Sequence, residues 1–259
     1  MSLNEQIAHC LTTLREHNPL CHNITNYVSM DINANVLLAI GASPFMADSF
    51  EEVQESVAMV DNTVCNIGTL DRYYIQSMVH AVEKVNELHK QWVLDPVGAG
   101  SCSTLLSYSP TVIRGNASEI IALAGIGAGG KGVDSTDSSN SAIEPAKQLA
   151  LKYNCVVGVS GASDYVTDGF HTYKIDNGTI LSTRITAAGC ALTSVVGAFV
   201  GAGIEPLLAT VSAFTIYGLA SELAEKISKG PGSLRVNLMD TFYHLTEEDV
   251  LKGAKVSEL

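Results

Sequence analysis

The segment Trp92-Val93-Leu94-Asp95-Pro96-Val97-Gly98-Ala99-Gly100 decides the predicted fold, because a short apolar run leads directly into an acid and a glycine-rich loop. Three other apolar runs also end in polar, glycine-containing loops: residues 63–67 before Gly68, 111–113 before Arg114-Gly115-Asn116, and 155–159 before Ser160-Gly161. Short apolar strands that alternate with helices are typical of a mostly parallel sheet covered on both faces.

Helical and strand patterns alternate along the rest of the chain. Helices are expected at residues 3–16, 28–40, 50–60, 70–90 and 140–153, with a further short strand at 19–24. Residues 165–183 are expected to form two or three antiparallel edge strands around Asp176-Asn177-Gly178, and the remainder to be helical apart from Gly230-Pro231-Gly232. We interpret residues 1–259 as a single α/β domain with a helical layer on each face of its sheet.

Composition argues against several classes of protein. The formal net charge is −12 and the Lys and Arg residues form no cluster, so no nucleic-acid partner is expected. None of the six cysteines belongs to a C-x-x-C pair, which argues against zinc, and several lie in apolar runs where a reduced cysteine behaves as a small hydrophobe. Residues 1–15 lack the apolar core of a signal peptide, and we therefore expect a cytoplasmic protein.

Residues 185–221 are apolar enough to suggest membrane helices. Glu205 is their only charged residue, and Gly197 and Gly201 form a G-x-x-x-G motif. The stretch is, however, rich in small residues, is broken at Gly203-Ile204-Glu205-Pro206 and has no flanking basic or tryptophan anchors. We therefore expect two buried helices and no membrane partner.

The loops after the core strands predict a binding site. The carboxyl ends of the strands of an open α/β sheet lie along one edge, where ligands bind. Loops between strands and helices are also polar and glycine-rich for purely structural reasons, and this alternative is adequate for any single loop. Four such loops, two of them with an acid beside a glycine, favour a site.

The segment Thr186-Ala187-Ala188-Gly189-Cys190-Ala191-Leu192-Thr193-Ser194 joins the edge strands to a helix. Its small residues would let a ligand approach the backbone, and the free N–H groups of the first helical turn, near Gly189, would face an anion. Cys190 would stand at the helix start, where the pKa of a thiol is expected to fall. The alternative is a small-residue helix start with a buried cysteine.

Asp95 and Glu119 are the carboxylates best placed for a metal, because each follows a strand. This position suits an Mg²⁺ ion that is bound mainly by water and nucleotide phosphates. Asp95 is otherwise a turn residue before Pro96, and Glu119 a first-turn acid that complements a helix dipole. Gly129-Gly130-Lys131-Gly132 lacks P-loop spacing and is interpreted as a mobile loop, and His22 as a structural residue.

Eight motifs, in order along nearly the whole chain, resemble those of the hydroxyethylthiazole kinases. They are His22-Asn23-Ile24-Thr25-Asn26, Ala34-Asn35, Gly41-Ala42-Ser43-Pro44-x-Met46, Asn66-Ile67-Gly68-Thr69-Leu70, Asp95-Pro96-Val97-Gly98-Ala99-Gly100, Arg114-Gly115-Asn116-Ala117-Ser118-Glu119-Ile120, Lys131-Gly132-Val133-Asp134-Ser135 and Gly230-Pro231-Gly232-Ser233. The resemblance implies a ribokinase-like, three-layer αβα fold. It also implies ATP- and Mg²⁺-dependent phosphorylation of the hydroxyl of 4-methyl-5-(2-hydroxyethyl)thiazole in thiamine salvage, by a homotrimer with the thiazole site at subunit interfaces.

The resemblance further implies a role for each matching residue. The residues expected to contact the thiazole are Asn26, Val28, Pro44, Met46, Gly68 and Ala187. Those expected to contact ATP are Arg114, Asn116 and Ser160, and those expected in the Mg²⁺–phosphate region are Asp95 and Glu119. Gly189 would help to hold the phosphoryl group, and Cys190 occupies the position at which related sugar kinases carry an aspartate base.

Three departures from the family pattern concern the rate more than the fold. Ala187 replaces a usual glycine, and it would be strained by roughly a kcal/mol if its φ angle is positive. Ser160 stands where Thr is common, and the stretch between Gly100 and Arg114 is short. Three alternatives stay open: another ribokinase-like small-alcohol kinase, such as a kinase for the pyrimidine half of thiamine; an ATP-dependent NAD(P)H-hydrate dehydratase; and a non-catalytic protein that binds thiazole or nucleotide.

Overall fold

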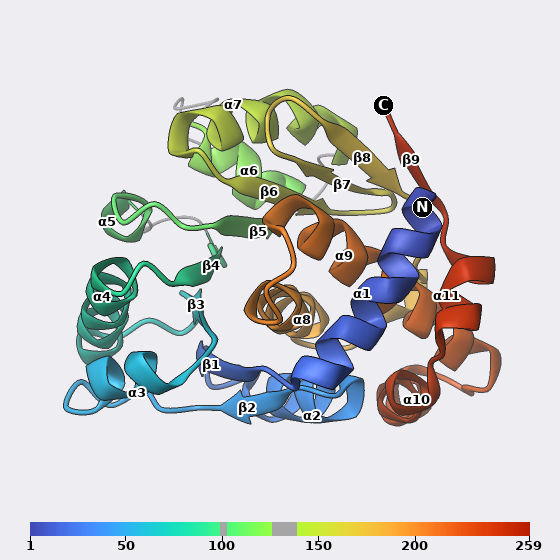
Figure 1. Ribbon diagram of the computed structural model, residues 1–259, viewed down its shortest axis with the longest axis horizontal. Helices are drawn as coiled ribbons and strands as arrows, with labels where there is room; N and C mark the ends of the chain where they lie inside the picture. Colours follow the sequence, from blue (N-terminus) through green and yellow to red (C-terminus); the bar gives the residue numbers. More distant parts are fainter. Residues whose placement is uncertain (99–102, 126–138) are drawn as a thin grey trace.

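The apolar runs form the strands of one sheet in the computed structural model, which describes residues 1–98, 103–125 and 139–259 (Figure 1). The predictions for Ala99-Gly100, for 129–132 and for the 131–135 motif lie outside the described residues. The strands are β1 Leu20–Ile24, β2 Ser43–Phe45, β3 Asn62–Asn66, β4 Gln91–Asp95, β5 Val112–Asn116, β6 Val156–Ser160, β7 Asp164–Thr167, β8 Thr172–Ile175 and β9 Val256–Glu258.

The sheet is mostly parallel, as predicted. Its strand order is β2-β1-β3-β4-β5-β6-β7-β8-β9, and every pair from β2 to β6 is parallel, whereas β6 to β9 pair antiparallel. The carboxyl ends of β1, β3, β4, β5 and β6 therefore meet along one edge. The described residues of the predicted polar loops lie at or next to this edge.

Two helical layers enclose the sheet, so the predicted three-layer architecture is confirmed (Figure 1). On one side lie α1 Leu3–His17, α2 Met30–Ile40, α8 Ala188–Gly201, α9 Pro206–Lys226, α10 Pro231–His244 and α11 Glu247–Gly253. On the other lie α3 Val53–Met59, α4 Arg72–Glu87, α5 Ser103–Leu106, α6 Ala117–Leu123 and α7 Ile143–Tyr153. Two 3₁₀ turns, η1 Ser139–Ala142 and η2 Ile180–Arg184, complete the described elements.

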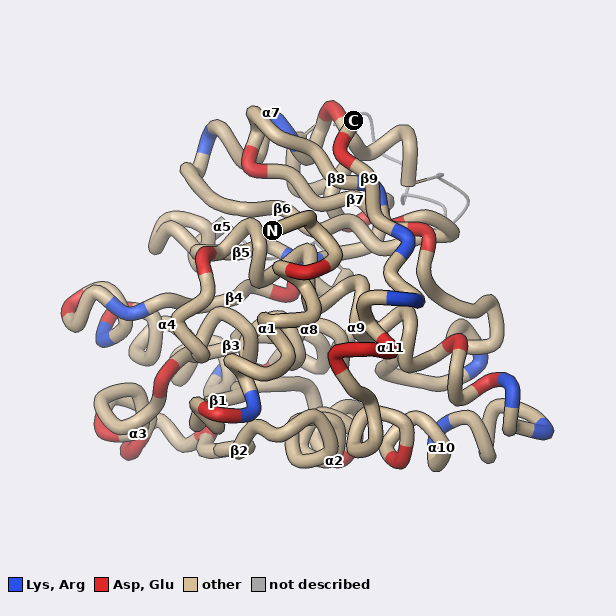
Figure 2. Tube along the Cα trace, turned by 45° about the vertical axis from the view of Figure 1, so that its right-hand side comes forward, with Lys and Arg blue, Asp and Glu red and all other residues tan. Residues whose placement is uncertain are grey.

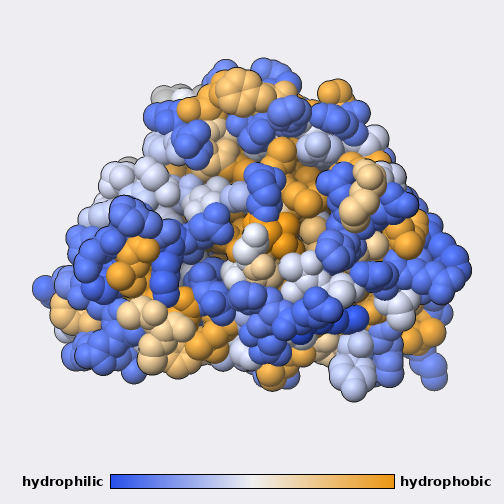
Figure 3. All heavy atoms as spheres, viewed as in Figure 1, coloured by the Kyte–Doolittle hydropathy of each residue, from blue (hydrophilic) through white to orange (hydrophobic). Residues whose placement is uncertain are grey.

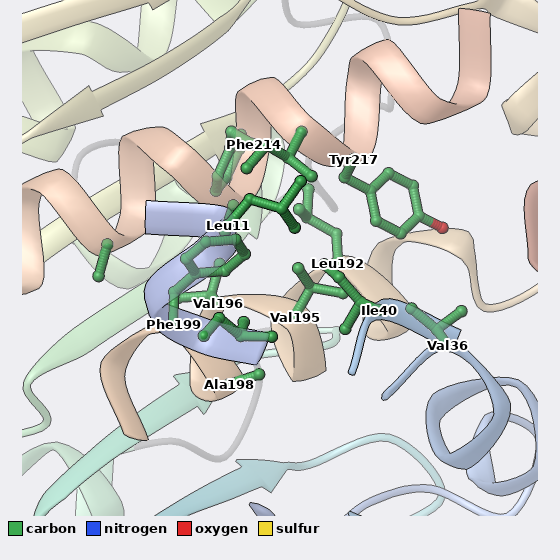
Figure 4. Packing of buried hydrophobic residues seen from close by; sticks show 14 of the residues in the cluster. Leu11, Val36, Ile40, Leu192, Val195, Val196, Ala198, Phe199, Phe214 and Tyr217 are labelled. Atoms are coloured by element: carbon green, nitrogen blue, oxygen red, sulfur yellow. The ribbon is translucent and has the colours of Figure 1, made fainter. Parts of the chain in front are cut away.

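Successive strand residues face opposite layers, as strand geometry requires. Val93 of β4 belongs to the core on the α8 side, whereas its neighbour Leu94 packs in the core on the α4 side with Met78. Figure 4 shows the α8 side, where Phe199 of α8 and Phe214 of α9 are packed among aliphatic side chains. Burial on both faces explains why the strands read as continuous apolar runs rather than as alternating ones.

The small residues of α8 serve close packing against the sheet. A Cβ atom on Gly197 would lie 2.5 Å from Cγ2 of Val64, and one on Gly201 would lie 2.8 Å from Oδ1 of Asn62. Among the described residues, α9 is the helix that is long and apolar enough to cross a membrane, but most of its apolar stretch is buried in the core. The prediction of two buried helices is therefore confirmed.

Charged and other hydrophilic residues cover much of the surface. Lys and Arg are scattered among more numerous Asp and Glu residues along the chain (Figure 2). On the face shown in Figure 3, hydrophilic residues form most of the rim and apolar residues gather towards the centre. Apolar atoms contribute a large share of the exposed surface in folded proteins generally.

Two details of the antiparallel end differ from the prediction. The β7–β8 hairpin turns at Asp168-Gly169, where the Asp168 carboxylate accepts the N–H groups of Phe170 and His171 at 2.8 and 2.6 Å and Gly169 has a φ of +95°. The predicted turn residue Asn177 is buried instead, and its amide donates to the Gly253 carbonyl at 2.9 Å. The strand that follows β8 in the sheet is β9, from the C-terminal segment that was expected to be helical.

Candidate active site

Asp95, the last residue of β4, is the centre of the polar edge. Its side chain is fully buried, and its Oδ2 atom accepts hydrogen bonds from Nδ2 of Asn66 at 2.8 Å and from the Thr193 hydroxyl at 2.6 Å. The guanidinium of Arg114 lies 3.9 Å from the same oxygen. Three elements, β3, β5 and α8, therefore converge on one carboxylate oxygen.

The second oxygen of Asp95 has no hydrogen-bond partner among the described residues, although it is buried. Burial raises the pKa of this carboxyl to about 6, against the opposing effects of Arg114 and of the Thr193 and Asn66 hydrogen bonds. Burying a carboxylate with a bare oxygen is costly, and such atoms require an explanation. A ligand that binds at Oδ1 would supply one.

The Arg114 guanidinium is held beside Asp95 at the polar edge of the sheet. Arg114 is 6% exposed, donates a hydrogen bond through Nη2 to the Ser160 hydroxyl at the end of β6, and leaves its buried Nε without a partner in the described residues. Its guanidinium also lies against the backbone of Gly189, where a Cβ atom would be 2.7 Å from Nη1. The Arg114 cation therefore lies directly beside the start of α8.

Helix α8 begins after a residue with a positive φ angle. Ala187 is the N-cap residue, with φ 62° and ψ 13°, in the left-handed region that costs an L-residue roughly 1–2 kcal/mol. The substitution of alanine for the usual glycine is therefore strained. The helix that follows is 14 residues long, and the N–H groups of its first turn have no partner within the helix. This end is suited to an anion.

The Cys190 thiol lies in the first turn, next to the polar edge. The Nδ2 atom of Asn26 donates to its sulfur at 3.4 Å. The expected fall in the pKa of this thiol is wrong: burial, and then the charge of Asp95, raise it. Both effects outweigh the hydrogen bonds from Asn26 and Asn66 and the charge of Arg114.

Asn26 and Gly68 are brought together beside Cys190. The Nδ2 atom of Asn26 also donates to Oδ1 of Asn66 at 2.8 Å, and a Cβ atom on Gly68 would lie 3.0 Å from the Asn26 side chain. Only a glycine fits here without displacing Asn26. The loops after β1 and β3 thus form one wall next to the carboxylate.

Glu119 begins α6 together with Asn116. The Asn116 side chain accepts the Glu119 N–H at 2.9 Å, and the Glu119 carboxylate accepts the Asn116 N–H at 2.8 Å, which is a capping box. Its other oxygen accepts from the N–H of Gly98, in the loop after β4, at 3.4 Å. Glu119 is therefore a helix-capping acid, and its charge contributes to the raised pKa of Asp95.

The other predicted thiazole contacts lie at the margin of the sheet. Pro44 belongs to the edge strand β2 and Met46 follows it, while Val28 is 58% exposed. The ring of His22 anchors this region, because its Nε2 lies 2.7 Å from the Ala47 carbonyl oxygen. Its interpretation as a structural residue agrees with that contact.

Sequence reasoning missed Asn66 as a separate site residue, and it missed Thr193. Asn66 stood within a motif and Thr193 within the small-residue segment, but neither was given a role. The available signal was position: Asn66 ends a buried strand, and Thr193 follows Cys190 by three residues, which places both on one side of a helix.

Comparison with known proteins shows similarity along nearly the whole chain. Residues 11–248 match the model of the Hydroxyethylthiazole kinase family. The chain belongs to the hydroxyethylthiazole kinase family. A hydroxyethylthiazole kinase of Photobacterium profundum is 46% identical, with 95% of this chain and 92% of the relative covered. The one of Pyrococcus abyssi is 44% identical, with 98% of each covered.

Solved structures agree with this membership. The hydroxyethylthiazole kinase of Pyrococcus horikoshii OT3 superposes with a TM-score of 0.90 at 43% identity, covering 98% of each chain. The pyridoxal kinase of Staphylococcus aureus, solved with pyridoxal, superposes with a TM-score of 0.66 at 16% identity. The superposition covers 93% of this chain and 97% of that chain. This second likeness concerns the fold alone, which is ribokinase-like as expected.

Proposed function

We propose that this protein transfers the γ-phosphoryl group of ATP to the hydroxyl of hydroxyethylthiazole, in the cytoplasm, as a step of thiamine salvage. Membership of the hydroxyethylthiazole kinase family supports the reaction. One observation supports the location of the site: Asp95, whose buried Oδ1 atom has no hydrogen-bond partner among the described residues, and Arg114 lie together at the N-terminal end of α8. A carboxylate, a guanidinium and a helix N-terminus can supply the positioning and charge neutralisation on which phosphoryl transfer depends.

The reaction is an in-line displacement. The hydroxyethyl oxygen forms a bond to the γ-phosphorus, the bond from that phosphorus to the bridging oxygen of ADP breaks, and the hydroxyl proton leaves. The transition state is loose, so catalysis depends on position and on neutralised charge. Arg114 and the N–H groups near Gly189 would bind the equatorial oxygens, and Ser160 would hold Arg114 in place.

The carboxylates fit a magnesium ion that is held mostly by water and phosphate. Magnesium sites of this type need only one or two carboxylates, and Asp95 offers its Oδ1 atom, which has no partner in the described parts of the chain. Asp95 would hold the ion directly or through water, and Glu119 from the capping box through water. When bound, Mg²⁺ neutralises charge on the phosphates.

The thiazole would lie beside Asn26, Gly68 and Ala187, with Cys190 next to its hydroxyl. Because the pKa of Cys190 is raised, its side chain is mainly the protonated thiol near pH 7, and only the minor thiolate form would accept the hydroxyl proton, late in the reaction. A loose transition state tolerates a weak base, since the hydroxyl becomes acidic only as the bond to phosphorus forms.

A homotrimer with sites at the subunit interfaces would complete this pocket. Pro44 and Met46 lie at the sheet margin, and Tyr27 and Val28 are each 58% exposed, although they adjoin Asn26. Exposed apolar residues beside a polar site suit coverage by a second subunit. Light scattering in solution tests this assembly: a trimeric mass supports it, and a monomer at millimolar substrate contradicts it.

The experiment that tests the function is ATP consumption by purified protein with Mg²⁺, with and without hydroxyethylthiazole. Thiazole-dependent turnover, with the phosphorylated alcohol detected as product, is expected. Thiazole binding without turnover would instead support a non-catalytic binding protein. Turnover with another alcohol alone, or with NAD(P)H hydrate, would support the other ribokinase-like activities.

A further inference from the structure

We propose that Asn66 is a positioning residue that joins the acceptor-alcohol end of the site to its phosphoryl end. One buried side chain contacts both halves: its Oδ1 atom accepts from Asn26, at the proposed thiazole wall, and its Nδ2 atom donates to Asp95. The inference rests on the proposed function, which assigns the thiazole to Asn26 and the phosphoryl group to Asp95.

The orientation of the Asn66 amide is fixed by chemistry. The backbone N–H of Gly68 is only a donor, and it lies 3.0 Å from Oδ1. The ionised Asp95 carboxylate is only an acceptor, and it lies 2.8 Å from Nδ2. Because an amide has one acceptor end and one donor end, a flip would place donor against donor and acceptor against acceptor. Asn66 therefore has a single arrangement, with 1% exposure.

Thr193 completes the hold on Asp95 from the opposite element. Its hydroxyl donates to the same Oδ2 atom at 2.6 Å, so β3 and α8 fix one oxygen of the carboxylate, while Oδ1 has no partner within residues 1–98, 103–125 and 139–259 and is available to a ligand. The Thr193 hydroxyl also lies 3.2 Å from the carbonyl oxygen of Gly189, which connects the carboxylate to the start of α8. Partners that orient a ligating group in this way typically contribute 10- to 100-fold to affinity or activity.

A physical consequence is coupling between the two substrates. Direct hydrogen bonds link Asn26 to Asn66 and Asn66 to Asp95, so a thiazole contact that shifts the Asn26 amide also shifts the Asp95 carboxylate that faces the phosphoryl group. Binding of the alcohol should therefore raise the affinity for magnesium and nucleotide, and by thermodynamic reciprocity the nucleotide should raise the affinity for the alcohol.

The chain offers a matched control for each of the two donors to Asp95. Asn23 of the neighbouring strand β1 is equally buried, and its amide donates to the Cys21 carbonyl and accepts from the Ser194 hydroxyl at 2.7 Å. Asn23 thus resembles Asn66, and Ser194 resembles Thr193, in side-chain chemistry and burial, and each lies next to its counterpart in the fold. Neither Asn23 nor Ser194 donates a hydrogen bond to Asp95 in the described residues.

The first test is calorimetric binding of a non-hydrolysable ATP analogue with Mg²⁺, with and without hydroxyethylthiazole. We expect the thiazole to tighten nucleotide binding at least threefold in the wild type and in Asn23→Leu, and to leave it unchanged in Asn66→Leu. A wild type without coupling, or an Asn66→Leu variant that keeps it, overturns the proposal. Because the readout is binding, the result is separate from whether wild-type turnover depends on the thiazole.

The second test remains informative if Asn66→Leu fails to fold. Thr193→Val is expected to lower kcat by 10- to 100-fold with an unchanged KM for the thiazole, Thr193→Ser to recover kcat to within about threefold, and Ser194→Ala to behave as wild type. A purely structural role would make Thr193→Val and Ser194→Ala equally active at equal melting temperature. That outcome overturns the proposal.

Discussion

The guanidinium of Arg114 occupies the space that a side chain at Gly189 would need. A Cβ atom at this position would lie 3.0 Å from Nη2 and only 2.7 Å from Nη1, and the shorter distance is less than real Cβ atoms keep from other atoms. Any larger residue at 189 must therefore move the cation that is proposed to bind the γ-phosphoryl group. The position is constrained by a close approach, and its backbone angle imposes no such limit.

Gly189→Val should abolish thiazole-dependent ATP consumption, and Gly189→Ala should lower kcat by about 100-fold, a loss comparable to that of one oxyanion-hole donor. Gly232→Ala is the control, because Gly232 is likewise the second residue of a helix but has open space around its Cβ position. Steady-state rates of all three variants decide the matter. A Gly189→Val enzyme as active as the wild type would contradict the assignment of the anion site.

Ala187→Gly should relieve backbone strain. Its φ of 62° costs alanine roughly 1–2 kcal/mol, while the greater freedom of glycine in the unfolded chain offsets about 0.4–1 kcal/mol. We expect the free energy of unfolding in urea to rise by up to about 1 kcal/mol. Asn154→Gly is the control, since Asn154 has a φ of 51° and asparagine tolerates that region better, and it should gain less. Destabilisation by Ala187→Gly would count against strain.

Cys190→Asp should retain or raise kcat, because a carboxyl group ionises at a lower pH than a thiol whose pKa burial has raised, so more of the base form is available to accept the proton. Cys190→Ala should lower kcat modestly, about tenfold or less, since the loose transition state depends little on the base. Initial rates between pH 6 and pH 9 test both variants. Complete inactivity of Cys190→Asp, with intact folding and thiazole binding, would contradict a base position at residue 190.

His22 should make the protein less stable in acid. Burial lowers its pKa below the usual value of about 6.5, against smaller opposing effects of the Ala47 carbonyl and of Asp48. The unfolded chain then binds the proton more readily, so the stabilising contribution is complete above about pH 6.5 and is lost as the pH falls towards the folded-state pKa. One such group changes the free energy of unfolding by at most about 1.4 kcal/mol per pH unit.

Urea titrations at pH 5, 6, 7 and 8 measure this effect. His22→Gln should flatten the decline on the acid side. His171→Gln is the control of opposite sign, because Asp168 raises the pKa of the exposed His171, whose contribution is present in acid and is lost as the pH rises. An unchanged acid slope in His22→Gln would show that the ring does not carry the effect.

Much of the architecture could be predicted because local patterns and tertiary structure agree. Strands such as Gln91–Asp95 are buried on both faces, so they can be recognised in the sequence as continuous apolar runs. The hairpin turn was placed wrongly because Asn177-Gly178 competed with Asp168-Gly169, which is also a turn signal. Strand β9 was missed because its three residues depend on pairing with β8 rather than on local preference.

The site was predictable in its residues more than in their electrostatics. Strand-end positions indicated Asp95 and Arg114, since parallel strands bring their carboxyl ends together, whereas Gly189 was indicated by a small-residue segment at the start of a helix. The pKa of Cys190 was predicted in the wrong direction because a helix start lowers it only if the sulfur stays hydrated, whereas this thiol is largely buried beside Asp95. Burial and neighbouring charge depend on packing, which no local spacing contains.

The strand order also bears on association between molecules. The edges of a sheet offer unpaired N–H and C=O groups to any other chain, and long apolar edges promote aggregation. Here the two edges are β2 and β9, each three residues long. Pro44 removes a donor from the first, and Glu258 places a negative charge on the second. A residue proposed to contact the substrate thus also keeps the sheet from growing into a neighbouring molecule.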